Sequence, residues 1–496
     1  MSNNQKQLKE IIKHRLDKLS AIKSLGINPF AYSYPKNINI EEIISNPDKY
    51  NDKEIKIAGR IISLRKMGKS TFLNLQDMNE RIQVYLKDTN LNESVYDSIV
   101  RKLDIGDIVG VAGCVFFTKT NELSIKASGV EILSKSLRPL PNMKEKDGKT
   151  FFSFDDKEQR FRKRYLDLII NTDNKKIFKQ RANIIDNIRK FLNLNSYIEV
   201  ETPILQPLYG GANARPFTTF HNTLEQKLYL RIADELYLKR LIIGGFEKVY
   251  EISKNFRNEG MDRNHNPEFT MLEYYCAYSD VYQMMEFTES MIKSVASNIN
   301  FSNDKISFNK EFNKSSFFSL LDKYSGKSFS SMSENEIKKT LKAEKISIDK
   351  KYGYAKSLDK AFSYYVEPNL IQPTFVTDYP KELSPLAKVK RDSDGTLVER
   401  FELFIDGMEI ANAFSELNDP IDQRERLENQ SKLKDLGDEE AQVLDVDFLE
   451  AMEIGMPPTG GVGIGIDRLV MILTNQKSIK DVILFPAMRN EIPEDQ

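Results

Sequence analysis

The sequence has few of the residues that mark a disulfide-stabilised, metal-centred or membrane protein. Only two of its 496 residues are cysteines, Cys114 and Cys276, and they lie far apart without a CxxC partner. Neither a disulfide framework nor a zinc site is therefore expected. Three histidines are too few for a histidine-rich metal centre. No apolar run approaches the ~18 residues of a membrane-spanning helix. We expect a cytoplasmic protein with no membrane partner.

An excess of either charge is also missing. The formal net charge is −1, so any surface that binds nucleic acid must be a local patch. The first 19 residues contain no apolar core, which argues against a secretory signal, and Glu10 and Asp17 interrupt the basic face of a mitochondrial presequence. With 40% hydrophobic and 29% charged residues, the composition is typical of a soluble globular protein of two to four domains.

Residues 5–24 predict an amphipathic helix that extends the N-terminus. Its apolar positions are Leu8, Ile11, Ile12, Leu16 and Leu19, and its basic positions are Lys6, Lys9, Lys13, Arg15 and Lys18. Two interpretations of the basic face remain open, a solvated surface and a contact with nucleic acid.

Residues 54–135 predict five short strands separated by Gly, Asn and Asp, and an OB-fold barrel is the best match. No acid falls between Glu54 and Asp77, whereas five basic residues do: Lys56, Arg60, Arg65, Lys66 and Lys69. A basic barrel with an exposed Phe72 could stack single-stranded bases, although a Phe72 buried in the core is the alternative. The two prolines and many charges of residues 136–155 predict a linker.

The most informative stretch is 249–275, which reads as strand, polar loop and strand. Because side chains alternate along a strand, Glu251, Ser253, Asn255 and Arg257 share one face, as do Phe269, Met271, Glu273 and Tyr275. The loop between the strands carries His265 and Asn266. Arginine offers a bidentate fork to carboxylate or phosphate, and phenylalanine a stacking face to a base. A polar surface hairpin is the alternative interpretation.

FRNEG and HNPEFTMLEYY in this stretch resemble motif 2 of the class II aminoacyl-tRNA synthetases, with the lysyl enzymes nearest in wording. The resemblance implies that Arg257 holds the α-phosphate and the amino-acid carboxylate. It also implies ATP binding by the loop and stacking of adenine on Phe269; the loop residues concerned are Glu259, His265 and Asn266. Asn264 stands where bacterial relatives often have arginine, so the loop departs from the family pattern at the position of the triphosphate contact.

Upstream, Gly210 and Gly211 allow a ligand to approach the backbone closely, although a plain turn would also use them. Glu235 opens a helical segment, where an acid usually serves the helix dipole. In the lysyl family the matching glutamate binds the substrate α-amino group beside the backbone of Gly211. We favour that role because the rest of the site agrees with it.

The segment 401–419 predicts a hairpin around Asp406-Gly407. This turn places Phe404 opposite Glu409, so Glu402 and Glu409 lie diagonally on one face. Two such carboxylates repel unless a cation lies between them, and Mg²⁺ bound to a triphosphate suits oxygen ligands, with a metal-free solvent-facing pair as the alternative. Asn412, Phe414 and Glu416 have the opposite parity to Glu409. For both sets to face one pocket, we predict a bulge near Ala411.

The family resemblance also implies the amino acid that is bound. Glu416 and Tyr275 match the residues that receive the lysine ε-ammonium, with Glu273 close by. An ammonium removed from water needs negative charge and acceptors, and a pocket with Glu235, Glu273 and Glu416 would select a dibasic amino acid. An aspartyl or asparaginyl enzyme would not want three acids there. The remaining residues assigned to lysine are Gly211, Asn412, Phe414 and Gly463.

Near the C-terminus, Gly460, Gly461, Gly463 and Gly465 precede a helix that opens with Asp467-Arg468. No GK[ST] follows, so this is not a P-loop. With motif 2 upstream it resembles motif 3, whose arginine, here Arg468, packs over the adenine and contacts the γ-phosphate.

Earlier, a helical segment at 177–191 and a strand at 198–205 resemble motif 1, the dimer element, although an ordinary core helix and strand would look alike. Pro203 favours an edge position for this strand.

The sequence therefore predicts an α+β protein with an N-terminal extension at 1–53, an OB-fold anticodon-binding domain at 54–135 and a class II catalytic domain at 156–496. That domain has a mainly antiparallel sheet and a helical insertion at about 310–370. By the resemblance, Phe72, Gln83 and Glu122 contact the anticodon, and the chain is a homodimer that charges tRNA(Lys) with lysine, using ATP and Mg²⁺. A lysyl transferase acting on a protein and a non-catalytic tRNA-binding relative remain as alternatives.

Overall fold

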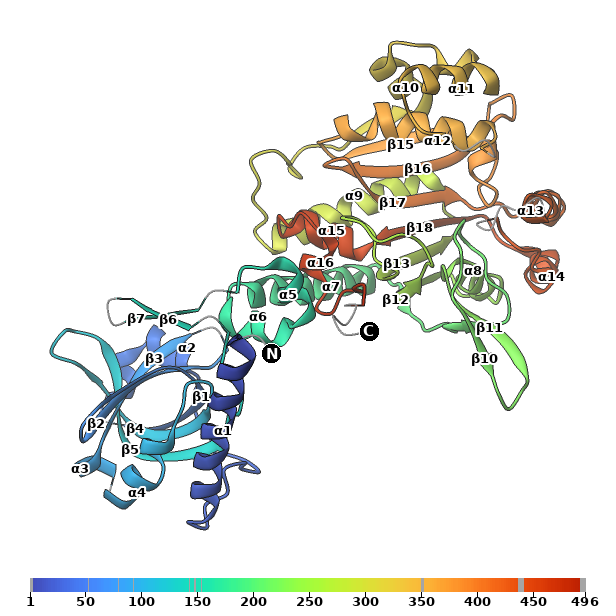
Figure 1. The fold of residues 1–496 in the computed structure, drawn as a ribbon. Coiled ribbons are helices and arrows are strands. Elements are labelled where there is room, and N and C mark those ends of the chain that lie inside the picture. Colours follow the sequence, from blue (N-terminus) through green and yellow to red (C-terminus); the bar gives the residue numbers. More distant parts are fainter. Residues whose placement is uncertain are drawn as a thin grey trace. The chain divides into compact units, whose positions relative to one another are not determined.

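The computed structural model describes residues 3–51, 53–78, 80–91, 93–141, 143–146, 149–152, 154–348, 352–435 and 441–490. The chain divides into two compact units, Met1–Lys176 and Ile177–Gln496. Figure 1 shows the elements of each. Among the described residues, no helix combines the length and the apolar character needed to cross a membrane.

The first unit is built on a closed five-stranded barrel, as predicted. Its strands, in the order β1-β2-β3-β5-β4, are β1 (Glu54–Met67), β2 (Ser70–Gln76), β3 (Arg81–Lys87), β5 (Leu123–Ser134) and β4 (Ile108–Phe117). Alternation places one set of apolar side chains inside, for example Leu73 and Leu75 of β2. Closure leaves no open sheet edge. The short helices α3 (Asp88–Leu91) and α4 (Glu93–Ser98) lie between β3 and β4.

The N-terminal helix α1 (Asn3–Lys23) differs from its prediction on one face, and α2 (Ile40–Ser45) follows it. Arg15, expected among the solvated basic residues, is buried. Its guanidinium donates hydrogen bonds of 2.9–3.0 Å to the carbonyl oxygens of Ile105, Ser136 and Arg138. Lys18 pairs with Asp104 at 2.5 Å. Arg15 was misassigned because helical spacing shows a side chain's direction but not the backbone that lies opposite.

The predicted linker contains structure of its own. β6 (Met143–Lys146) and β7 (Lys149–Phe152) form an antiparallel hairpin. The helices α5 (Lys157–Arg162) and α6 (Arg164–Ile170) follow in the same unit, and α7 (Asn174–Leu194) begins there and continues into the second unit.

The second unit is organised around an eight-stranded sheet, with the order β14-β15-β16-β17-β18-β13-β12-β8. These strands are β14 (Asn313–Ser316), β15 (Thr374–Pro380), β16 (Leu397–Ile405), β17 (Met408–Ser415), β18 (Thr459–Gly465), β13 (Glu268–Ala277), β12 (Lys248–Phe256) and β8 (Ile198–Glu199). The six central strands are antiparallel, and only the edge strands β14 and β8 pair in parallel. This confirms the mainly antiparallel sheet, and β8 confirms the edge position expected before Pro203.

The large core of this unit packs α7, α9 (Val281–Asn298) and α15 (Ile466–Leu473) against the sheet. A capping box with Asp280 and Gln283 begins α9. The insertion forms its own core from α10 (Phe317–Ser325), α11 (Glu334–Ala343) and α12 (Tyr354–Tyr365), which Figure 1 shows beside β15 and β16. The insertion predicted at about 310–370 is thus helical, as expected.

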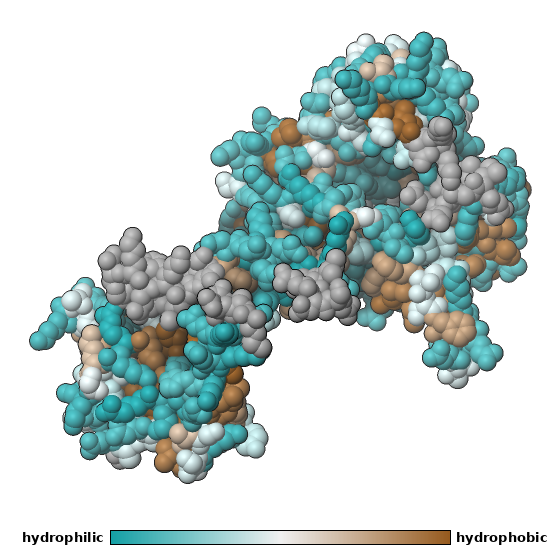
Figure 2. All heavy atoms as spheres, in the orientation of Figure 1, coloured by the Kyte–Doolittle hydropathy of each residue, from teal (hydrophilic) through white to brown (hydrophobic). Residues whose placement is uncertain are grey.

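The second unit contains further helices and a second, smaller sheet. They are α8 (Glu235–Ile243), α13 (Pro420–Asp435), α14 (Val446–Gly455), α16 (Ile479–Val482) and a small sheet of β9 (Leu205–Gln206), β10 (Thr218–His221) and β11 (Gln226–Leu230). Short 3-10 helices occur at Pro47–Tyr50, Val100–Lys102, Phe329–Ser331, Glu367–Asn369 and Lys381–Leu383. In Figure 2 the visible surface is mainly hydrophilic, and the β10–β11 hairpin projects from the second unit.

Candidate active site

The hairpin of β12 and β13 brings the predicted polar residues onto one face. The registered pairs are Val249 with Tyr275, Glu251 with Glu273, Ser253 with Met271, and Asn255 with Phe269. Residues directly opposite share a face, so the two sets predicted from alternation are one set. The polar surface alternative does not hold, because Glu273 and Tyr275 are each only 3% exposed.

The neighbouring strand β18 contributes glycines where this face needs room. Glu273 pairs with Gly463, which on its other side pairs with Asn412 of β17. Tyr275 is related in the same way to Phe414 through Gly461. A Cβ at Gly461 would collide with Glu416 Oε1 and the Tyr275 ring, and one at Gly463 would lie 2.5 Å from Met271 Cε. Because these glycines have no side chains, β18 leaves space between the functional side chains of β13 and those of β17.

The predicted bulge is present in β17. Phe404 pairs with Glu409, but the next residue of β16, Leu403, pairs with Ala411, so Ile410 is an extra residue in the ladder. The bulge changes the parity of the strand beyond Glu409. As a result Glu409, Asn412 and Phe414 all face the same pocket.

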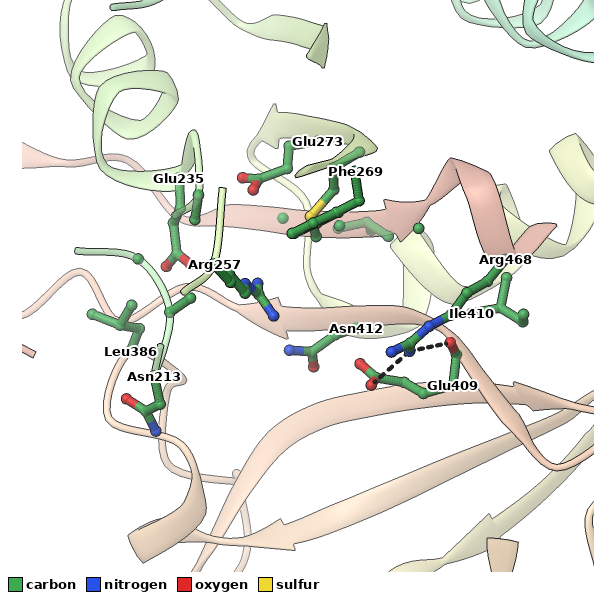
Figure 3. Close-up of a pocket in the computed structure, with 18 of the residues that line it drawn as sticks. Asn213, Glu235, Arg257, Phe269, Glu273, Leu386, Glu409, Ile410, Asn412 and Arg468 are labelled. Atoms are coloured by element: carbon green, nitrogen blue, oxygen red, sulfur yellow. Dashed lines mark hydrogen bonds and ion pairs between the residues drawn. The ribbon is translucent and has the colours of Figure 1, made fainter. Parts of the chain in front are cut away.

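These elements enclose a pocket of about 340 Å³, a size suited to a small molecule. Its lining includes each residue predicted for amino acid or ATP: Gly211, Glu235, Arg257, Glu259, His265, Asn266, Phe269, Glu273, Tyr275, Glu409, Asn412, Phe414, Glu416, Gly463 and Arg468. Figure 3 shows Glu235 and Glu273 toward one end of the pocket, Glu409 and Arg468 at the other, and Arg257 between.

The first end of the pocket is acidic. Burial raises the pKa of Glu235 and of Glu416, the latter to about 8, while nearby Lys239 acts in the opposite direction. Burial, reinforced by the Asp234 and Glu235 carboxylates, raises the pKa of Glu273 well above its ordinary value. The Tyr275 hydroxyl donates to Glu273 Oε2 at 3.1 Å. Such a cluster can receive ammonium groups that have been removed from water.

Two arginines line the rest of the pocket, Arg257 in its middle and Arg468 at the second end. The Arg257 guanidinium lies 5.1 Å from the centroid of the Phe269 ring, and burial lowers the pKa of Arg257. Arg468 donates to the Glu409 carbonyl oxygen at 2.8 Å and lies 2.9 Å from His265 Nε2. Two cations on one wall can neutralise phosphate charge.

The motif 2 loop holds its polar side chains in different directions. His265 Nδ1 contacts the Asp262 carboxylate at 2.8 Å, which orients the ring toward Arg468. Asn266 Oδ1 accepts the Ala487 amide at 3.2 Å. Arg263, by contrast, donates to the Lys477 carbonyl oxygen and is not among the pocket residues. The pocket here is lined by Asn264 in place of a loop arginine.

Of the two predicted magnesium ligands, only Glu409 lines the pocket. Glu402 accepts a hydrogen bond from the Tyr379 hydroxyl at 2.8 Å and pairs with Arg400, and burial raises its pKa to about 7. Among the described residues, no group of three or more His, Cys, Asp and Glu could hold a metal. The donors therefore fit a Mg²⁺ that brings most of its oxygen ligands with a nucleotide.

Three residues of the site were missed in the sequence. Lys239 of α8 is fully buried between Glu235 and Glu416. Arg400 donates to Asn412 Oδ1 at 3.0 Å and so fixes that amide. Asp467 accepts the Thr270 amide at 2.7 Å and pairs with Arg181 at 2.5 Å, which ties α15 to β13 and α7. Lys239 had a sequence signal in its position four residues after Glu235, and Asp467 in its place beside Arg468, whereas Arg400 had none.

The residues predicted to read the anticodon lie on the barrel. Phe72 is half-buried outside the barrel core, with its ring 4.8 Å from that of Tyr85. Gln83 Oε1 accepts a 3.0 Å hydrogen bond from Ser124, and Glu122 is exposed. Of the five basic residues, Arg60 and Lys66 donate to backbone carbonyl oxygens within the unit. The basic patch is therefore smaller than the sequence indicated.

Comparison with known proteins agrees with this geometry. The family model described as tRNA synthetases class II (D, K and N) matches residues 156–489, and that of the OB-fold nucleic acid binding domain matches residues 55–133. The chain is similar to a protein of Porphyromonas gingivalis named "Lysine--tRNA ligase", with 47% identity over 96% of this chain and 85% of the relative. It is also similar to one of the same name in Christiangramia forsetii, with 49% identity over 99% and 88%. The chain therefore belongs to the class II tRNA synthetases, and among them to the family of lysine–tRNA ligases.

Proposed function

We propose that this chain activates L-lysine with ATP and transfers the lysyl group to the 3′ end of tRNA(Lys). The observation that carries this is that one pocket is lined by three buried carboxylates, those of Glu235, Glu273 and Glu416, and by two arginines, Arg257 and Arg468. Full-length similarity to lysine–tRNA ligases supports the same conclusion.

The acidic end would receive the two ammonium groups of lysine. Glu235, with the Gly211 backbone beside it, is assigned to the α-ammonium, and Glu416 with Tyr275 to the ε-ammonium. Glu273 accepts the Tyr275 hydroxyl at 3.1 Å and so directs it. Asn412, Phe414 and Gly463 complete the channel for the methylene chain. A shorter or neutral side chain would leave a buried carboxylate uncompensated.

The arginine end would bind ATP. Phe269 supplies a stacking face for adenine opposite Arg468, while Glu259, His265 and Asn266 contact the nucleotide from the loop. Arg257 orients the lysine carboxylate toward the α-phosphorus. An oxygen of that carboxylate attacks in line, the bond to the bridging oxygen breaks, and pyrophosphate leaves; a ribose hydroxyl of tRNA then displaces AMP from the acyl carbon. Positioning and neutralisation of charge suffice for this chemistry, without a side-chain nucleophile.

Mg²⁺ would enter with the nucleotide, held by Glu409 on the pocket wall and by Glu402 behind it. When bound, it would neutralise charge on the phosphate oxygens. Glu409 suits this because its side chain is 43% exposed toward the pocket. Arg400, which pairs with Glu402 and donates to Asn412, would couple the position of the metal ligand to that of the lysine channel.

The first unit would bind the anticodon through Phe72, Gln83 and Glu122, within a domain at 54–135 that the linker 136–155 connects to the catalytic domain at 156–496. A cytoplasmic homodimer is proposed from the family resemblance of motif 1. Exposed apolar residues of the segment 198–205 support it: Ile198, Ile204 and Leu205.

The test is aminoacylation of tRNA(Lys) transcripts, together with pyrophosphate–ATP exchange, across a panel of amino acids. We expect lysine alone to support both reactions at low concentration. Exchange without transfer to tRNA would indicate a lysyl transferase acting on a protein, and tRNA binding without exchange would indicate a non-catalytic relative. Loss of activity on chelation of Mg²⁺ would test the metal.

A further inference from the structure

The acidic end of the pocket contains an ammonium group of the protein itself. Lys239 lies one helical turn after Glu235 on α8, and its side chain has no solvent exposure. Its Nζ is 2.5 Å from Glu235 Oε1 and forms an ion pair with Glu416 Oε2. Thus one cation joins the two carboxylates that are assigned to opposite ends of the substrate lysine.

Each of these carboxylates uses one oxygen on Lys239 and turns the other toward the pocket. Glu235 Oε2 lies near Gly211, since a Cβ built on that glycine would be 3.7 Å away. Glu416 Oε1 lies over Gly461 beside the Tyr275 ring, is buried and has no hydrogen-bond partner among the described residues. An unpartnered buried oxygen indicates a ligand that supplies the missing donor.

We propose that Lys239 is a positioning residue, which fixes the spacing between the two ammonium subsites and thereby selects the length of the diamino acid. This inference rests on the proposed function. Because both carboxylates contact one Nζ, their bound oxygens cannot separate by more than about two hydrogen-bond lengths. The positions of the oxygens that face the pocket are thereby restricted, and we expect the four methylene groups of lysine to fit between them better than the three of ornithine.

Charge supports the same role. Three ammonium groups, those of Lys239 and the two of the substrate, match the three carboxylates Glu235, Glu273 and Glu416. Without Lys239, the carboxylates would be left with two cations in a site that excludes water, and one of them would retain a proton. The other groups that face the cluster are Asp234 from the start of α8, Tyr275 from β13 and Arg400 from β16.

The experiment compares Lys239→Met with the wild-type full chain in lysine-dependent pyrophosphate–ATP exchange between pH 6 and 9. We expect KM for lysine to rise by about 30-fold with a much smaller change in kcat, as for loss of a charged hydrogen-bond network. The preference for lysine over ornithine should fall about tenfold. Because the carboxylates lose the cation that favours ionisation, the decrease of KM with rising pH should move to higher pH by about one unit.

Lys135→Met is the matched control. Lys135 is equally buried and also bridges two carboxylates, those of Asp104 and Asp107, but it lies in the barrel. Its substitution should leave KM for lysine and its pH profile unchanged. Should Lys239→Met fail to fold, Lys239→Gln keeps two donors without the charge, and the same shift in pH profile is expected of it.

The inference is overturned if KM, ornithine preference and pH profile of Lys239→Met equal those of the wild type. It is also overturned if KM falls, because Lys239 would then compete with the substrate and not prepare its site. A wild-type chain without lysine-dependent exchange would instead reject the proposed function, so the two failures are distinguishable.

Discussion

Two fully buried lysines, one in each unit, form the same kind of cluster with different consequences. Lys135 bridges Asp104 and Asp107, and Lys239 bridges Glu235 and Glu416. In the barrel, the protein also satisfies the remaining acceptors, because Asp107 receives the amides of Asp104 and Ser136 at 2.8 Å each. In the pocket, a Glu416 oxygen has no such donor among the described residues. The first cluster is closed by the protein, and the second is open to a ligand.

The pKa shifts of the acids reflect this difference. Burial alone would raise the pKa of Asp104, but hydrogen bonds from Lys135 and Lys18 hold it below its ordinary value. Burial raises the pKa of Glu416 to about 8, even though Lys239 opposes the shift. A closed cluster therefore contributes stability at neutral pH, whereas an open one is costly until its ligand arrives.

The largest effect is expected in the open region. Arg257→Ala should lower lysine-dependent pyrophosphate–ATP exchange by about 10³-fold, because a preorganised cation aimed at developing charge is lost. Lys254→Ala is the control, since Lys254 lies on β12 three residues before Arg257, has the opposite parity and pairs with Glu268 at 3.7 Å. Melting temperatures of both variants should stay near the wild-type value. Exchange retained in Arg257→Ala would remove its assigned role.

Substitution of the lysine in the closed cluster should lower the stability of the barrel. Lys135→Met leaves two buried aspartates without their main cation, and we expect the free energy of unfolding of the barrel to fall by about 3 kcal/mol. Urea denaturation followed by hydrogen exchange of barrel peptides measures this loss. If Lys135→Met changed KM for lysine while sparing the barrel, the contrast between the two clusters would be wrong.

A smaller effect is expected at the surface of the barrel. Phe72→Ala should raise KM for tRNA in aminoacylation by about 30-fold, in line with the loss of one stacked base, and leave exchange unchanged. Tyr32→Ala removes a fully exposed aromatic residue of the same unit and serves as the control. Equal charging by both variants would separate Phe72 from the anticodon.

The smallest effect concerns pH and should have opposite signs in the two clusters. Because folding lowers the pKa of Asp104, this residue stabilises the folded protein above about pH 4, and its contribution is lost as the pH falls through the folded pKa. Because folding raises the pKa of Glu416 from 4.5 to about 8, this residue stabilises the folded protein below pH 4.5, and its contribution is lost as the pH rises toward about 8. Hydrogen exchange, corrected for intrinsic rates, should show changes of about tenfold in opposite directions, and added lysine should remove the loss near Glu416. Parallel changes would contradict the comparison.

Much of the site could be predicted because the information is local. Strand parity placed Glu273 and Tyr275 on one face, and the opposite parities of Glu409 and Asn412 predicted the bulge that the structure contains. Arg15 and Lys239 could not be assigned in this way. The partners of Arg15 lie 90 or more residues away, and Lys239 meets Glu416 from a distant strand. Alternation and spacing describe one element, whereas these contacts depend on how elements pack.

The extra residue in β17 has a consequence for how this chain could change. Ile410 is an extra residue in the strand, and its presence places Glu409 and Asn412 on the same face, where both line the pocket. A deletion of this single apolar residue would restore a regular ladder and keep the pairing of β17 with its neighbours. Glu409 and Asn412 would then stand two positions apart and would still share a face, so the bulge could be lost without separating the nucleotide half of the site from the amino-acid half.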